Sequence, residues 1–323
     1  MFKVCIVGLG AIGGWLAAHL QRVEGLSVCA LARGDTLAAV RAQGLRLDSG
    51  DDSWRVPLRA SDDPAELGVQ DLVILAVKGP AVAGVAAQVA QLCGPDTRVM
   101  TALNGLPWWF TAGLAVPGLA LTSVDPDGRI AALVPPARVI GCVVHASCAL
   151  RGPAWVHHVM GKGLLVGEAV GGSSAAVDAL ATLLVNAGFE ARAVDSIQRD
   201  AWYKLWGNMT TNPVSALTRA TTDRILADDL VREFTTAIMV EAAEVGERMG
   251  CPISQTPQDR HAITRSLGAF KTSMLQDIEA GRPIETDALL GAPRELAQQL
   301  GVATPMLDAL LGLTRLMDAC RGG

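Results

Sequence analysis

Three polar residues in the second half of the sequence have the types and spacing of a proton donor with two substrate ligands. Lys204, Asn208 and Asn212 follow one another at intervals of four. On a helix each such step turns about 40° beyond a full turn, so the three side chains share one polar stripe. A lysine can protonate an oxygen that gains negative charge during hydride transfer, and two amides can hold substrate oxygens. The alternative is a solvated polar face. Pro213 is expected to interrupt the helix beside Asn212.

A second polar group follows about 70 residues later in the chain. Ser273 and Asp277 are four residues apart, so they share one face of a predicted helix. Glu285 lies just past a Gly/Pro break, near the start of the next predicted helix. A carboxylate beside Lys204 would keep that amine charged and oriented. The alternative for Glu285 is a favourable acidic residue in the first turn of a helix.

A glycine-rich motif near the N-terminus is typical of a dinucleotide-binding turn. It follows the apolar run Lys3–Val7 and opens a helical pattern, which is the context that gives the motif weight. In such a turn the first glycine permits the tight bend, the second lets the backbone approach a pyrophosphate, and the third allows close packing of helix on strand. The free amides of the helix N-terminus would bind the phosphates. The residues predicted to contact the cofactor here are Gly8, Leu9, Gly10, Ala11, Ile12 and Gly13.

Arg33 determines the predicted cofactor preference. It lies 20 residues after Gly13, at the end of the second predicted strand, where NAD-binding sheets usually carry Asp or Glu for the ribose hydroxyl. A guanidinium at this place can clamp a 2′-phosphate through two parallel hydrogen bonds. The sequence therefore predicts NADP(H). If Asp35 rather than Arg33 faced the ribose, this preference would weaken or reverse.

Two further polar positions follow predicted parallel strands. Lys78 comes directly after the apolar run Asp71–Val77, and Asn104 with Gly105 follows Arg98–Leu103. Residues at the carboxyl ends of parallel strands line the ligand crevice of such sheets. Lys78 is therefore a candidate for a cofactor or substrate contact, and Asn104 could bind the nicotinamide ribose or a substrate hydroxyl. The alternatives are a surface lysine and a simple Asn-Gly turn.

The elements that must position these residues fall into two groups. In the first half, short runs apolar on both faces alternate with helical stretches, which indicates a parallel sheet covered by helices. The predicted fold is α/β, an N-terminal Rossmann-type doubly wound parallel sheet with a second, all-helical domain. We expect an NADP-binding domain over residues 1–194 and a helical substrate and catalytic domain over 195–323. Strands are expected at 139–147, 154–160 and 163–166, and helices of the second domain at 196–211, 222–249, 257–280, 286–300 and 305–319.

Composition excludes several classes of protein. The formal charge is −5, from 27 basic and 32 acidic residues, and half of the chain is hydrophobic. An acidic balance argues against broad nucleic-acid binding, and the apolar fraction argues against disorder. The longest uncharged stretch, Val99–Val124, is broken by glycines and prolines, so no membrane span is expected. Seven cysteines without a CxxC pair and five histidines without a metal-binding spacing predict no metal site. We expect a cytoplasmic protein, with a homodimer as an open possibility.

Taken together, these motifs resemble the ketopantoate reductase family over nearly the full chain. The likeness rests on GLGAIG, Arg33, Val77-Lys78, Asn104-Gly105, KxxxNxxxNP at Lys204–Pro213 and SMLQDIEAGRPIE at Ser273–Glu285. It implies NADPH-dependent reduction of a 2-oxo acid, 2-dehydropantoate, to pantoate. It also implies that Lys204 is the general acid, that Asn208 and Asn212 contact substrate, and that Ser273 holds the substrate carboxylate. By the same resemblance Asn104 meets cofactor and substrate, Glu285 lies near the nicotinamide, and the Ala146 backbone contacts the cofactor.

One position departs from the family pattern. Where a further substrate-contacting asparagine can follow the Asn-Pro pair, this chain has Thr222, and Trp108 and Trp109 add bulk after Asn104-Gly105. A related reductase of another 2-oxo acid therefore remains an alternative. A β-hydroxyacid dehydrogenase is another, although such enzymes usually carry a Met in the glycine motif. The last alternative, a non-catalytic NADP-binding sensor, leaves the Lys204 stripe unexplained.

Overall fold

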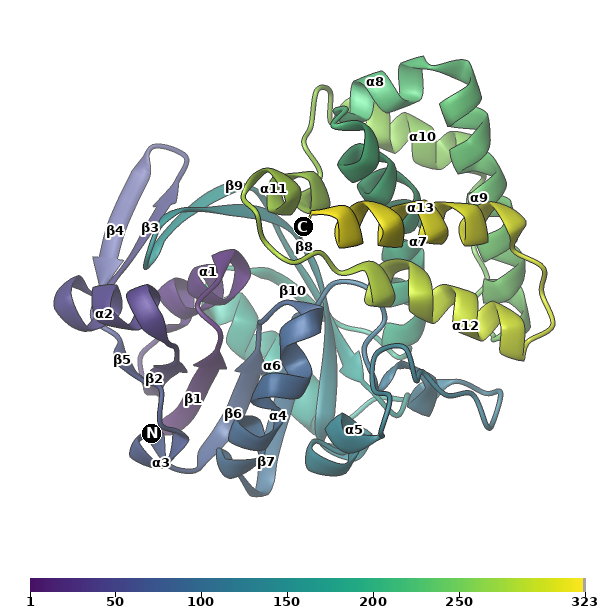
Figure 1. Ribbon diagram of the computed structural model, residues 1–323. Coiled ribbons are helices and arrows are strands. Elements are labelled where there is room, and N and C mark those ends of the chain that lie inside the picture. The colour runs from purple at the N-terminus through teal and green to yellow at the C-terminus, as the bar shows by residue number, and fades with distance from the viewer. Residues whose placement is uncertain (322–323) are drawn as a thin grey trace. The chain divides into compact units, whose positions relative to one another are not determined.

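The computed structural model describes residues 1–321 of the 323-residue chain. The chain divides into two compact units (Figure 1). The first unit consists of Met1–Leu103 and Gly128–Ile197, and the second consists of Asn104–Asp127 together with the chain from Gln198 onward. The backbone therefore passes from one unit to the other three times. The functional division at residues 194 and 195 stays a prediction.

The first unit is built on a sheet in which six consecutive strands, ending at one edge, are all parallel. Their order is β5-β2-β1-β6-β7-β8, so the chain starts in the middle, winds to one edge, and then winds to the other. This is the strand order of a Rossmann fold, with its switch point between β1 and β6. The predicted fold class is confirmed. The strands are β1 (Phe2–Val7), β2 (Leu26–Leu31), β5 (Arg59–Ser61), β6 (Gln70–Leu75), β7 (Cys93–Thr101) and β8 (Val139–Gly152).

Four further strands extend this sheet beyond β8. Three strands were expected between residues 139 and 166. The structure has two long strands there, β8 and β9 (Trp155–Glu168), which pair antiparallel as a hairpin. Parallel to β9 lie β3 (Leu45–Ser49) and β10 (Glu190–Ala193), and β4 (Asp52–Val56) is antiparallel to β3. Because β3, β4 and β10 are short and rich in charged residues, hydrophobic pattern alone did not reveal them.

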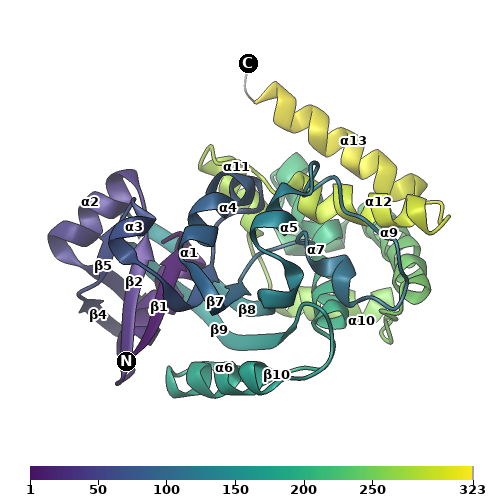
Figure 2. The same cartoon turned by 90° about the horizontal axis from the view of Figure 1, so that it is seen from below.

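Helices cover both faces of the sheet. Side chains of α1 and α6 join one hydrophobic core with strand residues, and Trp15, Leu16 and Leu20 of α1 are fully buried in it. Figure 2 shows α4 and α5 on the opposite side of the strands from α6. The α-helices of this unit are α1 (Ala11–Leu20), α2 (Gly34–Gln43), α3 (Pro64–Leu67), α4 (Val82–Gln91), α5 (Arg129–Leu133) and α6 (Ala175–Asn186); η1 (Gly79–Ala81) and η3 (Pro136–Arg138) are 3₁₀ turns.

Helices and helical turns are the only regular secondary structure in the described residues of the second unit, as predicted. The 3₁₀ turn η2 (Phe110–Gly113) lies in the segment 104–127, and η4 (Asp287–Gly291) is a π-helical turn. The α-helices are α7 (Ile197–Thr218), α8 (Thr222–Ala227), α9 (Asp229–Arg248), α10 (Pro257–Ser266), α11 (Ser273–Glu279), α12 (Ala292–Gln299) and α13 (Pro305–Cys320).

Several helix boundaries differ from those expected. The helix α7 runs through Pro213 to Thr218, so the predicted interruption is wrong. The missing Pro213 amide costs a helical bond, but the surrounding turn is buried, and its packing outweighs the local penalty. The expected helix 222–249 is divided at Asp228, whose side chain caps α9. The expected helix 257–280 is divided before Thr272, which caps α11.

The segment 104–127 is fastened to the helices of the second unit. The carboxylate of Glu295 on α12 accepts four hydrogen bonds, from the amides and hydroxyls of Thr122 and Ser123 at 2.5–2.9 Å. The Gln299 side chain bonds both the amide and the carbonyl of Ala120. Burial works to raise the pKa of Glu295, and the bonds from Thr122 and Ser123 outweigh it, so the pKa is lowered.

Candidate active site

The glycine motif forms the turn between β1 and α1 and fits a bound pyrophosphate. Gly8 has a φ of +93°, and a Cβ on it would lie 2.6 Å from a Val77 methyl. A Cβ on Gly13 would overlap the Gly8 carbonyl, so the helix approaches the turn as only glycine allows. Gly10, the N-cap of α1, has open space on its Cβ side, and no side chain caps the helix. The first amides of α1 therefore face a position that an anion can occupy.

Arg33 lies at the end of the neighbouring strand β2 and is the N-cap of α2. Its side chain is exposed and has no ion-pair or hydrogen-bond partner within residues 1–321. The backbone amides that begin α2 and an arginine at its N-cap can both bind a phosphate at that end of the helix. Asp35 is in the first turn of α2 and is also exposed.

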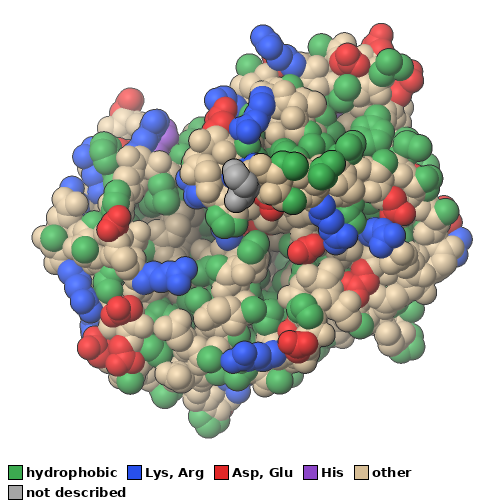
Figure 3. Space-filling view, viewed as in Figure 1, with side chains coloured by type: hydrophobic (Ala, Val, Ile, Leu, Met, Phe, Trp, Pro, Cys, Tyr) green, Lys and Arg blue, Asp and Glu red, His purple; other side chains and the backbone are tan. Residues whose placement is uncertain are grey.

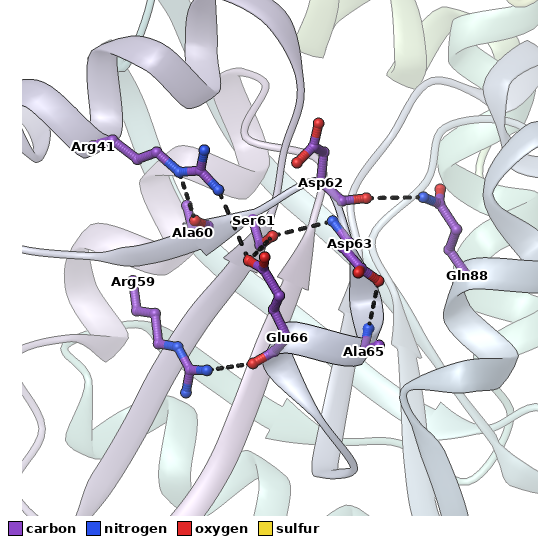
Figure 4. Close-up of polar contacts among 9 residues, drawn as sticks. All are labelled: Arg41, Arg59, Ala60, Ser61, Asp62, Asp63, Ala65, Glu66 and Gln88. Carbon is purple, nitrogen blue, oxygen red and sulfur yellow. Dashed lines mark hydrogen bonds and ion pairs between the residues drawn. The ribbon is translucent and has the colours of Figure 1, made fainter.

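The turn after β5, next to β2 in the sheet, is held by a polar network (Figure 4). The Ser61 hydroxyl donates to the Glu66 carboxylate at 2.6 Å, and Asp63 caps α3 through the Ala65 amide. Arg41 of α2 donates to the Ala60 carbonyl at 3.2 Å. These bonds tie α2, whose N-cap is Arg33, to the edge of the parallel sheet.

Two other predicted cofactor contacts also lie in the first unit. Lys78 follows β6, which pairs with β1 on the side opposite to β2. Lys78 is the N-cap of η1 and has an extended backbone. Ala146 lies in β8 where the pairing with β9 shifts register between His145 and Ser147. The structure thus places the glycine turn, Arg33 and Lys78 after three adjacent strands, β1, β2 and β6.

In the second unit Lys204 is bonded to Asn104. The Lys204 ammonium Nζ on α7 donates to the Asn104 carboxamide Oδ1 at 3.0 Å. Lys204 is half-buried, with Asn208 half-buried and Asn212 buried further along the same helix. The predicted polar stripe is therefore only partly open to solvent. Lys204 and the two amides of Asn208 and Asn212 are carried by one helix rather than by a loop.

The remaining predicted residues lie near the helices that follow α10. Ser273 is the first residue of α11 and is half-buried. Glu285 is 4 % exposed and precedes the π-helical turn η4. Asp277, which shares the face of Ser273, forms an ion pair with Arg282 at 2.9 Å. That pairing gives Asp277 a structural part in holding the Gly/Pro break.

The backbone of residues 104–106 packs on the π-helical turn. The Leu106 amide donates to the Ala288 carbonyl at 2.9 Å. Gly105 has a φ of +73°, and a Cβ there would lie 2.5 Å from the Ala288 oxygen and 2.7 Å from its Cβ. This contact joins residues far apart in sequence, and no local sequence pattern predicts it.

Thr222 is directed into the protein. It is 2 % exposed, and its hydroxyl donates to the Gly268 carbonyl at 2.9 Å while its amide donates to Phe270. This hydroxyl therefore serves the loop between α10 and α11. Trp108 and Trp109 are buried as well.

No group of three or more His, Cys, Asp or Glu in residues 1–321 is placed to hold a metal ion. Within the same residues, no helix combines the length and the apolar character that crossing a bilayer requires.

The parallel sheet with its glycine turn at the switch point defines a dinucleotide-binding protein of the Rossmann class, here joined to a helical unit that carries a lysine held by an amide. Comparisons with known proteins give the family. The model for ketopantoate reductase PanE/ApbA matches residues 4–171, and the model for the C-terminal part of ketopantoate reductase PanE/ApbA matches residues 196–318. The chain belongs to the ketopantoate reductase family and is an NAD(P)-dependent oxidoreductase that acts on the C=O group of a small keto acid.

Individual relatives agree with this. The 2-dehydropantoate 2-reductase of Mesorhizobium japonicum is 41% identical over 322 residues, which cover 99% of both chains. The crystal structure of a candidate ketopantoate reductase from Ralstonia solanacearum matches with a TM-score of 0.95 and 50% identity, over 99% of this chain and 98% of that one. The 2-dehydropantoate 2-reductase of Geobacter metallireducens matches with a TM-score of 0.86 and 28% identity, over 98% and 100% of the two chains.

Proposed function

We propose that this protein reduces 2-dehydropantoate to pantoate with NADPH. The full-length relative from Mesorhizobium japonicum bears that activity in its name. The observation that carries the proposal is the position of the half-buried Lys204 ammonium. Its Nζ donates to the Asn104 Oδ1 at 3.0 Å, and the helix that carries Lys204 also carries Asn208. A positioned proton donor with amides beside it is what reduction of a ketone requires of the protein.

NADPH is the proposed cofactor in preference to NADH. Arg33 has no partner in the described part of the chain and lies at the N-terminus of α2, where a 2′-phosphate would gain charge-assisted hydrogen bonds. Gly8, Gly10 and Gly13 would receive the pyrophosphate, and Lys78 and the Ala146 backbone would add contacts. When bound, the cofactor supplies the hydride.

The roles of the helical unit follow from proton and charge balance. As the ketone carbon accepts the hydride, its oxygen gains negative charge, and Lys204 donates a proton to that oxygen. Asn104 orients the ammonium, and Asn208 and Asn212 are proposed to hold substrate oxygens. Ser273 is proposed to bind the carboxylate. Glu285 would favour the charged form of Lys204.

A substrate panel tests this assignment. NADPH oxidation is followed with 2-dehydropantoate and with 2-oxo acids that have straight, branched and aromatic side chains, and 3-hydroxy acids are offered with NADP⁺. The proposal expects 2-dehydropantoate to have the highest kcat/KM. Thr222, whose hydroxyl is bonded within the protein, favours keeping another 2-oxo acid as the second candidate. Turnover of 3-hydroxy acids alone, or binding of NADPH without turnover of any compound, would reject both.

We also propose that the protein forms a homodimer through α13. Met306, Leu313 and Leu316 are 38%, 55% and 63% exposed on that helix, and apolar side chains lie along it in Figure 3. A ketopantoate reductase from Staphylococcus aureus with the same fold is described as dimeric. Light scattering of the L313E/L316E variant should give the mass of a monomer where the unchanged chain gives that of a dimer. A monomeric unchanged chain would refute this.

A further inference from the structure

We propose that Gly105 and Pro293 are positioning residues, which together seat the Asn104 carboxamide so that it holds the Lys204 ammonium. The inference rests on the proposed function for its kinetic test, and on a backbone arrangement for its physical basis. All of the residues concerned belong to the second unit.

The Ala288 carbonyl lacks the hydrogen bond that it would receive from Ala292 in an α-helix. In the π-helical turn the Ala292 amide bonds the Asp287 carbonyl, five residues back, whereas in an α-helix it would bond Ala288. The next amide in that register, five residues after Ala288, belongs to Pro293, which has no N–H. The Ala288 carbonyl therefore gains no bond from either residue.

The Ala288 carbonyl accepts its hydrogen bond from a residue outside the helix. The Leu106 amide donates to the Ala288 oxygen at 2.9 Å, so the chain after Asn104 is fixed to the helix by a backbone bond. Leu106 and Ala288 are both buried, and a buried carbonyl without a donor is unfavourable. The hydrogen bond from Leu106 to Ala288 is therefore retained unless a larger side chain keeps the two backbones apart.

The close approach of residue 105 to Ala288 requires glycine. At Gly105 the φ is +73°, and a Cβ would be 2.5, 2.6 and 2.7 Å from three atoms of Ala288, two of them backbone. Backbone atoms cannot rotate away as a flexible side chain can. Any larger residue at 105 must push residues 104–106 off the turn, and with them the carboxamide that accepts from Lys204.

The test is a double-mutant cycle on the full chain. Gly105→Ala should lower kcat by roughly 10- to 100-fold, the loss typical of a displaced catalytic group, with less change in the KM for NADPH. Asn104→Ala should do the same. The double variant should be no slower than Asn104→Ala alone, because Gly105 acts through Asn104. Additive losses would overturn the proposal.

Gly118→Ala is the matched control. Gly118 lies in the same segment with a φ of +80°, so alanine there meets the same backbone strain, but a Cβ would meet nothing within 4 Å. This variant should keep the kcat of the unchanged enzyme. If Gly105→Ala were no slower than Gly118→Ala, Gly105 would have no positioning role.

A second variant and a measurement that does not depend on activity test the same positioning role. Pro293→Ala restores an amide that competes for the Ala288 carbonyl, so kcat should also fall, by a smaller factor than in Gly105→Ala.

The chain has five lysines, so acylation of each amine can be followed by mass spectrometry. When the bond to Asn104 is lost, the Lys204 amine should react about 3-fold faster or more, relative to Lys271. Unchanged labelling in Gly105→Ala overturns the inference, even if the substrate proves to be a different acid.

Discussion

The ammonium of Lys204 and the carboxamide of Asn104 are joined by a hydrogen bond of 3.0 Å although 100 positions separate the two residues in sequence. The lysine is carried by the long helix α7, and the asparagine begins the segment that leaves the sheet after β7. Because both belong to the same compact unit, the donor and its acceptor are assembled within that unit.

Replacing Lys204 removes the proposed proton donor. Lys204→Met keeps the length of the side chain, and kcat should fall about 10²- to 10⁴-fold, the usual contribution of a general acid. The dissociation constant for NADPH, measured by fluorescence titration, should change less than about 3-fold. Equal losses in turnover and cofactor binding would contradict the assigned role.

Replacing Arg33 tests the cofactor preference. Charge-assisted hydrogen bonds to a phosphate are worth about 1.5–3 kcal/mol, so Arg33→Ala should raise the KM for NADPH roughly 10- to 100-fold. The KM for NADH, which lacks the 2′-phosphate, should stay nearly unchanged. Asp35→Ala serves as the comparison. If it rather than Arg33→Ala altered the preference, Asp35 would face the ribose.

His19 should make stability fall in mild acid. Burial lowers the pKa of His19, which is 8% exposed and bonds the Ala187 carbonyl through Nδ1 at 3.0 Å. The folded state therefore holds this imidazole neutral, while the unfolded chain protonates it near pH 6.5. The unfolded state binds more protons, so the free energy of unfolding decreases as pH falls below about 6.5.

Urea unfolding at pH 8 and pH 5.5 measures this effect. His19→Gln keeps a neutral donor but cannot be protonated, so its loss of stability between the two pH values should be smaller than that of the unchanged chain. His157→Gln, half-buried in the same unit, is the control and should leave the dependence as it was. Identical slopes for all three proteins would exclude His19 as the cause.

Glu295 should stabilise the segment 104–127 only while it is ionised. Its lowered pKa means that this contribution is present above the ordinary pKa of a glutamate and is lost as pH falls through the folded-state value. Glu295→Gln keeps one acceptor oxygen and replaces the other with an NH2 donor, so either Thr122 or Ser123 loses its acceptor, which should cost about 1–3 kcal/mol at pH 7. Proteolysis should then cut within 104–127 sooner. Glu244→Gln, on an exposed helix face, should behave like the unchanged chain.

Much of the first unit could be predicted because its signals are local. The apolar runs of β1, β2 and β6 and the glycine turn each depend on adjacent residues, and the strand order follows from the general rules for such folds. The charged strands β3 and β4 were missed, because β3 is stabilised by pairing with the distant strand β9, and β4 by pairing with β3, rather than by an apolar pattern.

The site was predictable in its residue types but not in its construction. The spacing of Lys204 and Asn208 indicated one face of α7, but nothing local places Asn104 on the same unit. The π-helical turn is likewise a tertiary effect, since Pro293 permits it and Leu106 satisfies it. Pro213 misled in the opposite direction, because propensity predicted a break where packing maintains a helix.

The excursion of residues 104–127 has a consequence for how such enzymes can be recombined. A chimera that takes its sheet from one relative and its helices from another, joined at residue 197, would bring Asn104 and Gly105 from the first parent and Lys204 and Ala288 from the second. Substitutions on either side of that seam must therefore be inherited as matched sets. Gene shuffling of this scaffold should yield active offspring only when crossovers spare the pairs that bridge the seam.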